Sequence, residues 1–239
     1  VGIIGLGYVG LPLAVNFAEA GIHVIGFEKS QEKANLVNKG DNYIGDIRDA
    51  VLREVVVEKL TLEATTDFTR MKECDALIIA VPTPLDKFRK PDMSYIESAC
   101  IEIGKNMKPG TFVSLESTTY PTTTEEFMLP LIQEYSKQNL LNVTRRLPAD
   151  QAGSSLVTAF SEGTDFWLAY SPERVDPGNK EFHTRNTPKV LGAMSNDGVE
   201  IGEALYLKAI DNIHKVSSPR VSEMVKILEN TYRLVNISL

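Results

Sequence analysis

Five short runs of apolar residues recur along the chain, and they constrain its fold more than any other feature. They read VGIIGLG from Val1, HVIGFE from His23, DALIIAVPT from Asp75, TFVSLEST from Thr111 and DFWLAYSP from Asp165. Runs that are apolar throughout, rather than at every second position, are typical of strands buried on both faces of a parallel sheet. Stretches with helical periodicity separate these runs, over residues 8–20, 31–38, 50–58, 94–106 and 121–137. The alternation predicts an α/β fold with a doubly wound, Rossmann-like parallel sheet.

The periodicity also predicts how the chain is divided. A polar, irregular stretch over 139–164 is interpreted as a long loop, and we assign it no role. A short strand is expected near 213–216, and a long helix runs from residue 217 or 218 to the end. We therefore expect one domain over 1–216, with 217–239 as the start of a helix that leads to a second domain. Val1 lies inside a strand pattern and Leu239 ends a helical run without a stop signal, so the sequence is interpreted as part of a longer protein.

The composition excludes several classes of protein. The 25 basic and 32 acidic residues give a net charge of −7, which argues against non-specific binding of nucleic acid. No apolar run approaches the roughly 20 residues of a membrane span, and the first residues do not resemble a signal peptide. Two cysteines do not make a disulfide framework and fit a reducing cytoplasm. No metal site is predicted.

The first apolar run is followed by the pattern G-x-G-x-x-G, formed by Gly5, Gly7 and Gly10. Its place between a strand and a helix predicts a dinucleotide site, in which the glycines give a tight turn and close approach to a pyrophosphate at the helix N-terminus. Glu28 ends the next strand, where a carboxylate can accept hydrogen bonds from ribose hydroxyls and repel a 2′-phosphate. The pattern therefore favours NAD over NADP. The alternative is that the glycines serve only the turn.

Four further motifs occur in a fixed order: GYVGLP from Gly7, PTP from Pro82, ESTTYP from Glu116 and SPER from Ser171. Except for the first, each follows a predicted strand directly, where ligands bind in open parallel sheets. The series resembles the UDP-glucose and GDP-mannose dehydrogenase family, and most closely its UDP-N-acetylhexosamine dehydrogenases. The latter share the longer strings PTPL from Pro82, PDMSY from Pro91, NTPK from Asn186 and ENTYR from Glu229.

The resemblance implies an enzyme that moves two hydrides in succession from the terminal hydroxymethyl of a UDP-N-acetylhexosamine to NAD, through a thioester on a cysteine, and forms a homodimer about its central helix. It implies catalytic roles for four residues: Glu173 activates water, Lys226 and Asn230 stabilise oxyanions from one helix face, and Thr118 places a hydroxyl beside the nicotinamide. The expected contacts of the cofactor are Gly5, Gly7, Tyr8, Val9, Gly10, Glu28, Lys33, Val81, Thr83, Ser117 and Thr118.

Each role has a simpler alternative. Glu173 can be a solvated glutamate paired with Arg174, and Lys226 and Asn230 can be two polar residues on a wet helix face. Thr118 can instead cap the helix that begins near Pro121. Lys33 can be a solvent-facing lysine.

Three features depart from the family. Its nucleophilic cysteine lies in a glycine-rich segment beyond the last helix, and neither Cys74 nor Cys100 matches that segment, so residues 1–239 are expected to bind NAD without completing the oxidation. Thr122 stands where the family usually has glycine; we expect it to begin a helix and to be tolerated there. The third departure is the 139–164 stretch. Two other functions stay open: a single-step β-hydroxyacid dehydrogenase of the 6-phosphogluconate type, and a catalytically silent NAD-binding module.

Overall fold

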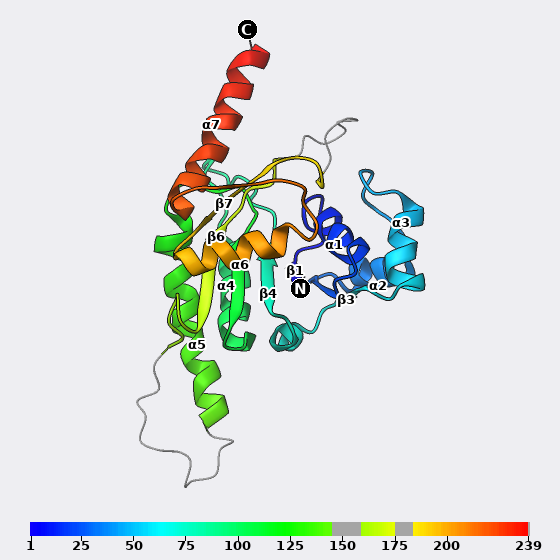
Figure 1. Cartoon of the computed structure of the whole chain (residues 1–239), viewed down its shortest axis with the longest axis horizontal. Helices are drawn as coiled ribbons and strands as arrows, with labels where there is room; N and C mark the ends of the chain where they lie inside the picture. The colour runs from blue at the N-terminus through cyan, green and yellow to red at the C-terminus, as the bar shows by residue number, and fades with distance from the viewer. Residues whose placement is uncertain (145–158, 175–183, 239) are drawn as a thin grey trace.

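The chain folds around an eight-stranded sheet in the part described by the computed structural model, which comprises residues 1–144, 159–174 and 184–238 (Figure 1). The spatial order is β3-β2-β1-β4-β5-β6-β7-β8. The strands are β1 (Gly2–Ile4), β2 (Val24–Phe27), β3 (Leu62–Thr65), β4 (Ala76–Ile79), β5 (Thr111–Leu115), β6 (Phe166–Tyr170), β7 (Lys189–Ala193) and β8 (Ile213–Lys215). The first six pair in parallel, with the reversals of order that a doubly wound sheet requires, so the predicted fold class is confirmed.

The sheet differs from the expectation at its far edge. β7 runs antiparallel to β6, with Tyr170 opposite Gly192, and β8 runs parallel to β7. Neither β3 nor β7 was predicted. The amino end of β7 therefore lies at the same edge of the sheet as the carboxyl ends of β4, β5 and β6.

Helices cover both faces of the sheet. They are α1 (Gly10–Glu19), α2 (Gln31–Lys39), α3 (Asp49–Arg53), η1 (Glu54–Glu58), η2 (Phe68–Glu73), α4 (Ser94–Asn106), η3 (Thr123–Met128), α5 (Leu129–Thr144), α6 (Asn196–Tyr206) and α7 (Pro219–Ser238). Two apolar cores result, one under α1, α2, α3 and α6 and the other under α4, η3 and α5. Each fully buried aliphatic or aromatic side chain contributes about 1.5–3 kcal/mol. The predicted helices and the strand near 213–216 are present, but η2 was not predicted. The loop expected over 139–164 begins later than predicted, because α5 continues to Thr144, and residues 145–158 of that stretch lie outside the described residues.

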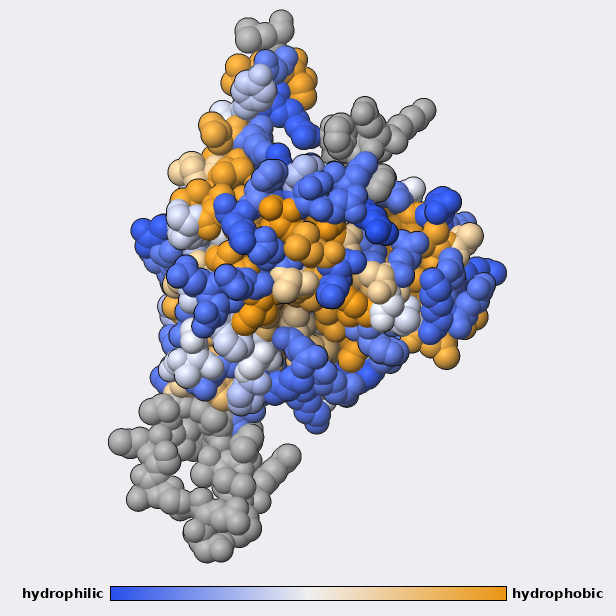
Figure 2. Space-filling model, viewed as in Figure 1, coloured by the Kyte–Doolittle hydropathy of each residue, from blue (hydrophilic) through white to orange (hydrophobic). Residues whose placement is uncertain are grey.

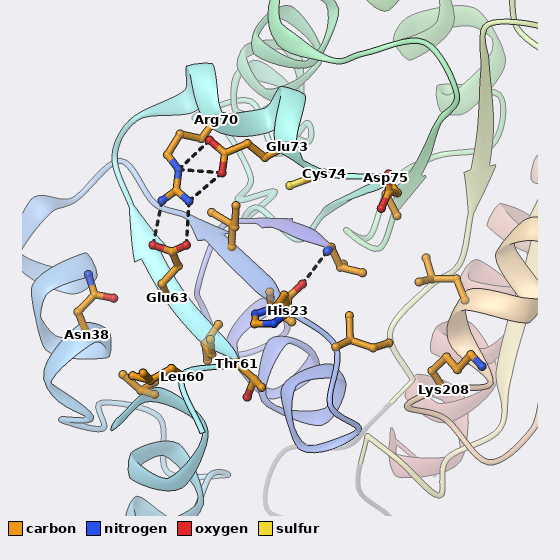
Figure 3. A pocket seen from close by; sticks show the side chains of 18 of the residues that line it. His23, Asn38, Leu60, Thr61, Glu63, Arg70, Glu73, Cys74, Asp75 and Lys208 are labelled. Carbon is orange, nitrogen blue, oxygen red and sulfur yellow. Dashed lines mark hydrogen bonds and ion pairs between the residues drawn. The ribbon is translucent and has the colours of Figure 1, made fainter. Parts of the chain in front are cut away.

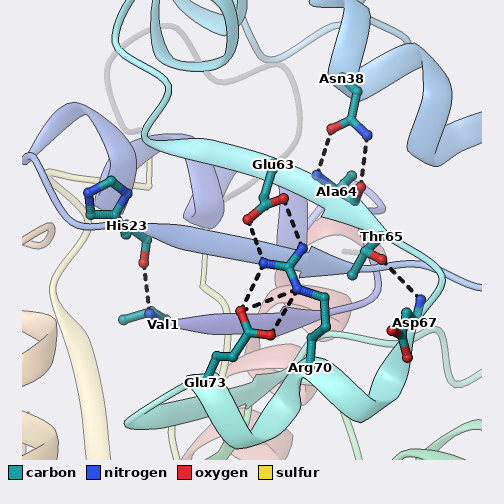
Figure 4. A network of polar contacts seen from close by, with 9 residues as sticks. All are labelled: Val1, His23, Asn38, Glu63, Ala64, Thr65, Asp67, Arg70 and Glu73. Carbon is teal, nitrogen blue, oxygen red and sulfur yellow. Dashed lines mark hydrogen bonds and ion pairs between the residues drawn. The ribbon is translucent and has the colours of Figure 1, made fainter.

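The edge strand β3 is held by side chains from two neighbouring elements (Figure 4). Asn38 on α2 both donates to the carbonyl oxygen of Ala64, at 2.8 Å, and accepts from its N–H, at 2.7 Å. Arg70 on η2 forms paired hydrogen bonds to Glu63 of β3, at 2.8 and 2.9 Å, and it also contacts Glu73. The two Asn38 contacts occupy backbone groups that an edge strand otherwise offers to another chain, and the Arg70 contacts tie its side chain Glu63 to η2.

The last helix, α7, projects away from the body of the molecule (Figure 1). In its first turns Pro219, Ser222 and Glu223 are buried, and from residue 230 to 238 every residue is exposed. Several exposed side chains on α7 are apolar, and apolar surface is visible in Figure 2 along the projection that ends at C in Figure 1. None of the helices in the described ranges is both long and apolar enough to cross a membrane.

Candidate active site

The glycine-rich turn after β1 has the geometry that a dinucleotide requires. Gly5 has a φ of +91°, and a Cβ there would lie 2.8 Å from the carbonyl oxygen of Ala80. A Cβ on Gly10 would lie 1.9 Å from the carbonyl oxygen of Gly5, so α1 packs against the turn only because residue 10 is glycine. Gly7 has open space beside its Cα.

The entry turn of α1 offers N–H groups to an anion, although within the helix the N–H of Leu11 donates to the carbonyl oxygen of Gly7 at 3.0 Å and Pro12 has none. No side chain caps the helix, and its first turn contains no acidic residue. By contrast, α2 is capped by Ser30, whose hydroxyl accepts from the N–H of Lys33 at 3.3 Å. A helix N-terminus without a protein cap carries free donors and the positive end of the helix dipole, which suit a pyrophosphate. Tyr8 and Val9 lie in this turn, and the Tyr8 side chain is exposed.

A cavity of about 310 Å³ lies beside the turn and is lined by Gly5, Gly7, Glu28, Lys33 and Val81, among other residues. The Glu28 carboxylate is already fixed there: one oxygen accepts from the N–H of Leu6 at 3.2 Å and the other from that of Ser30 at 3.1 Å. Each oxygen keeps accepting capacity for a ribose hydroxyl. The cavity therefore fits an adenosine group held by a carboxylate.

Tyr43 supports the same turn and was not predicted. Its hydroxyl donates to the carbonyl oxygen of Leu6 at 2.7 Å, and the ammonium of Lys33 lies 5.9 Å from its ring centroid. Burial, together with the charge of Glu28, raises the pKa of Tyr43, so the phenol stays protonated and donates. Lys33 itself is exposed at the mouth of the cavity. A tyrosine in an irregular segment gives no sequence signal for this contact.

The loops after β4 and β5 are joined by hydroxyl groups. Ser117 donates to the carbonyl oxygen of Val81 at 2.7 Å, and Thr83 donates to that of Thr118 at 2.8 Å. The structure thus brings these four predicted residues together. The Thr118 side chain is exposed, and Thr122 rather than Thr118 is the N-cap residue of η3, so the alternative that Thr118 caps this helix is wrong. The next residue, Thr119, is buried and shares a hydrogen bond with Thr123.

The loop after β6 meets α7. The Lys226 ammonium donates a hydrogen bond to the carbonyl oxygen of Glu173. Burial lowers the pKa of Lys226, although the carboxylates of Glu173 and Glu229 partly oppose the shift. Lys226 and Asn230 both line a cavity of about 420 Å³, as their spacing of four residues predicts.

Arg174 fixes this junction. Its guanidinium forms two hydrogen bonds to the carboxylate of Glu229 on α7 and a third, of 2.9 Å, to the carbonyl oxygen of Pro188. Its backbone N–H donates to Glu173 at 2.7 Å. An arginine that donates two hydrogen bonds to one carboxylate fixes the relative orientation of the two groups as well as their distance. The loop after β6, the segment before β7 and α7 are therefore locked together.

A buried charged pair lies beneath the junction. Glu116, at the end of β5, is bonded to Lys189, at the start of β7, and accepts from the hydroxyl of Tyr206 at 2.7 Å. Glu116 is 1% exposed and Lys189 4%. Burial raises the pKa of Glu116, against the opposing effect of Lys189. Both residues belong to the sequence motifs, but their pairing across the unpredicted strand β7 was missed.

Neither cysteine is suited to be a nucleophile. Cys74 and Cys100 are free and buried, and burial raises the pKa of both thiols. A thiol with a raised pKa contains little thiolate. Among the described residues, no three His, Cys, Asp or Glu side chains are grouped so that they could hold a metal ion.

A cavity of about 980 Å³, larger than the two described above, lies at the amino ends of the strands (Figure 3). His23, Arg70, Asp75 and Lys208 are among the residues that line it. None of the predicted site residues does. Because the glycine turn and the motif loops lie at the carboxyl ends of the strands, we place the site there.

The fold and the glycine turn with its acidic partner define a Rossmann-type NAD-binding protein. The UDP-glucose/GDP-mannose dehydrogenase family, NAD binding domain, matches residues 1–210, and the chain belongs to this family. NAD is the cofactor that the domain binds.

Similar proteins extend over the whole chain. UDP-N-acetyl-D-glucosamine 6-dehydrogenase of Pseudomonas aeruginosa is 34% identical over 100% of this chain and 50% of its own length. UDP-N-acetyl-D-mannosamine dehydrogenase of Campylobacter jejuni is 35% identical over 99% of this chain and 54% of its own. The solved structure of UDP-D-ManNAc dehydrogenase from Pyrococcus horikoshii is 32% identical, with a TM-score of 0.83 over 99% of this chain and 51% of that one. The chain thus spans about half the length of the curated relatives it matches.

Proposed function

We propose that the protein containing this chain oxidises the terminal hydroxymethyl of a UDP-N-acetylhexosamine to a carboxylate in two NAD-dependent steps. The observation that carries the proposal is the meeting of Lys226 with the Glu173 loop, at the same edge of the sheet as the glycine turn. The relatives that act on UDP-N-acetylglucosamine and UDP-N-acetylmannosamine support the substrate class.

The proposed roles follow from the surroundings of each residue. NAD, when bound, accepts the hydride that leaves the sugar carbon. The Lys226 ammonium and the Asn230 amide face one cavity and would stabilise an oxygen that gains negative charge. Glu173 would activate water, and Thr118 would present its exposed hydroxyl on the cofactor side.

The thiolate in this scheme must come from outside residues 1–239. The sequence contains two cysteines, and both are buried with raised thiol pKa values. We therefore propose that residues 1–216 form the NAD-binding domain and bind NAD without completing the reaction. In this division, residues 217–239 begin the central helix that connects to the rest of the protein.

We further propose that the complete protein is a homodimer that works in the cytoplasm. Val221, Met224, Leu228 and Val235 are exposed and follow one another at spacings of three, four and seven residues. Such spacings place them on one face of α7, separate from Lys226 and Asn230. A second copy of the helix would cover this stripe. The two cysteines, too few for a disulfide framework, support the cytoplasm.

The test is to count NADH formed per UDP-sugar consumed by the complete protein, against a panel of UDP-hexoses and UDP-N-acetylhexosamines. We expect two NADH per UDP-N-acetylhexosamine, and at least a hundredfold loss of kcat in Lys226→Ala. One NADH per sugar would instead indicate a single-step alcohol dehydrogenase. No NADH with any sugar, while NAD still binds, would indicate a silent binding module.

A further inference from the structure

Glu223 is a fully buried carboxylate on α7, and the proposed chemistry gives it no task. It is 0% exposed. It accepts from the N–H of Thr122 at 2.6 Å, from the N–H of Thr124 at 2.9 Å and from the hydroxyl of Thr124 at 2.7 Å. A buried carboxylate with three such donors has a defined position and little freedom to move.

Two of these donors are N–H groups at the start of η3, the helix that follows the ESTTYP motif. No side chain of the helix itself caps it. The first N–H groups of a helix have no partner within the helix, and buried ones require an acceptor. Here the acceptor comes from a residue about 100 positions later in the chain.

Other contacts join the same two regions. Ser222 donates to the carbonyl oxygen of Tyr170 at 3.2 Å, and the hydroxyl of Tyr170 donates to the carbonyl oxygen of Ser117 at 3.3 Å. The chain entering α7 passes so close to β7 that a Cβ on Gly192 would lie 2.2 Å from the carbonyl oxygen of Ser218. The base of α7 is therefore fixed against both β6 and β7.

Lys226 follows Glu223 by three residues, almost one helical turn, so the two lie on neighbouring parts of one helix face. Whatever fixes Glu223 also fixes the direction from which Lys226 reaches the Glu173 loop. The partners of Glu223 belong to the segment that carries Ser117 and Thr118 on the cofactor side. One carboxylate thus connects the cofactor-side segment to the helix of the proposed oxyanion-stabilising lysine.

We propose that Glu223 is a positioning residue, which clamps residues 117–124 to α7 and thereby sets the place of Lys226 relative to the cofactor. The catalytic part of this inference rests on the proposed function. The clamp itself does not. Nothing in the geometry brings Glu223 to a ligand, since its carboxylate is buried and occupied by its three donors.

The test compares Glu223→Gln and Glu223→Ala with Glu126→Gln in the complete protein. The control removes an exposed contact between the same elements, since Glu126 pairs with Arg220 of α7. In both Glu223 variants we expect at least tenfold faster hydrogen exchange at the amides of Thr122 and Thr124, and at least a tenfold lower kcat. The KM for NAD should change less than kcat, because Glu28 and the glycine turn are not altered. The control should match the wild type throughout.

A second readout separates positioning from a general loss of stability. Burial lowers the pKa of Lys226, so a loosened α7 should hydrate the ammonium and return its pKa toward the ordinary value of 10.5. The alkaline limb of the kcat profile should then move to higher pH in the Glu223 variants and not in the control. If Glu223→Ala fails to fold, the same measurements on Glu223→Gln test the proposal, because glutamine keeps the shape of the glutamate side chain and one of its two acceptor oxygens.

Unchanged exchange at Thr122 and Thr124 would overturn the clamp. Faster exchange with unchanged kcat and pH profile would overturn the positioning role. If the wild type oxidises no UDP-sugar, the proposed function fails, and the inference is then decided by the exchange rates and by the pH dependence with which Lys226 reacts with acetic anhydride. A change in the reactivity of Lys226 confined to the Glu223 variants would support positioning, and its absence would overturn it.

Discussion

Glu28 is set in place by the backbone before a cofactor arrives. Its two oxygens accept from Leu6 and Ser30, so the carboxylate needs little reordering to accept ribose hydroxyls. Hydrogen bonds to a charged acceptor contribute about 1.5–3 kcal/mol. We predict that Glu28→Ala weakens NAD binding by about tenfold or more in isothermal calorimetry. Glu32→Ala, which removes an exposed carboxylate from the first turn of α2, is the matched control and should bind as the wild type does. Equal affinity in both variants would remove Glu28 from the ribose site.

Thr122 stands in a conformation that favours glycine. It stands at the start of η3, as expected, but as the N-cap residue and with a φ of +78°, in the left-handed region. A β-branched residue there costs about 1–2 kcal/mol, of which the flexibility of glycine in the unfolded chain offsets part. We predict that Thr122→Gly raises the free energy of unfolding by about 1 kcal/mol, or the Tm by about 2–4 °C.

Thr122→Ala is the control, because it keeps the Cβ and hence the strain. It should not stabilise the protein in the same thermal and urea unfolding experiments. Equal gains in both variants would show that the hydroxyl or methyl of Thr122, and not its backbone, is unfavourable.

At the residue scale, the sequence predicted the site residues whose roles depend on neighbouring positions in the chain. Gly5, Gly10 and Glu28 could be found because a strand, a turn and a helix follow one another within 30 residues. Glu223 and Tyr43 could not, because their partners depend on how distant segments meet. A glutamate in a helix has the same local pattern whether it caps another helix or faces water.

Among the elements, the edge strand β3 is held to its neighbours by polar side-chain contacts. Arg70 joins Glu63 of β3 to Glu73 of η2, and the three side chains are between 28% and 54% exposed. Hydrogen bonds from Arg70 lower the pKa of both glutamates below the ordinary value of 4.5. A lowered carboxyl pKa in the folded state stabilises the protein above the unfolded value and loses this effect as the pH falls through the folded value.

We therefore predict that Arg70→Gln lowers stability modestly at pH 7, and that the difference from wild type shrinks as the pH falls below about 4.5. Salt should also reduce this stability difference, because it screens the exposed ion pairs of Arg70. Urea unfolding at pH 7 and pH 3.5, with and without 1 M NaCl, measures both effects. Lys72→Gln, on the same helix, controls for the loss of a positive charge. A difference that is constant with pH would show that Arg70 acts through packing.

The strands that sequence reasoning missed have a physical explanation. β3 reads LEAT, half of it polar and short enough to be taken for a loop. β7 reads KVLGA and begins with a lysine, which is rare in a buried strand and is tolerated only because Glu116 lies beside it. Since β7 was missed, so was the pairing of Glu116 with Lys189.

For the whole molecule, we predict that self-association depends on the apolar stripe of α7. Val235→Glu in the complete protein should shift sedimentation from dimer to monomer, because a charge buried in a helix pair without a partner is costly. Leu234→Glu adds the same charge to an exposed apolar neighbour that points about 100° away along the helix, and should leave the dimer intact. Dissociation in both variants, or in neither, would contradict this interface.

The contacts of α7 fix its base and leave its far end free to move, so any motion of the helix pivots about the base. Contacts to the body of the protein are made by Ser222, Glu223, Lys226 and Glu229, and the exposed arm from residue 230 to 238 extends about 13 Å beyond them. Lys226 lies between the anchors, so a swing of the far end by several ångströms turns the helix about a point close to the ammonium. A misplacement of about 1 Å can cost a hundredfold in rate. The Lys226 amine lies at the fixed base of α7, where a swing of the helix displaces it least.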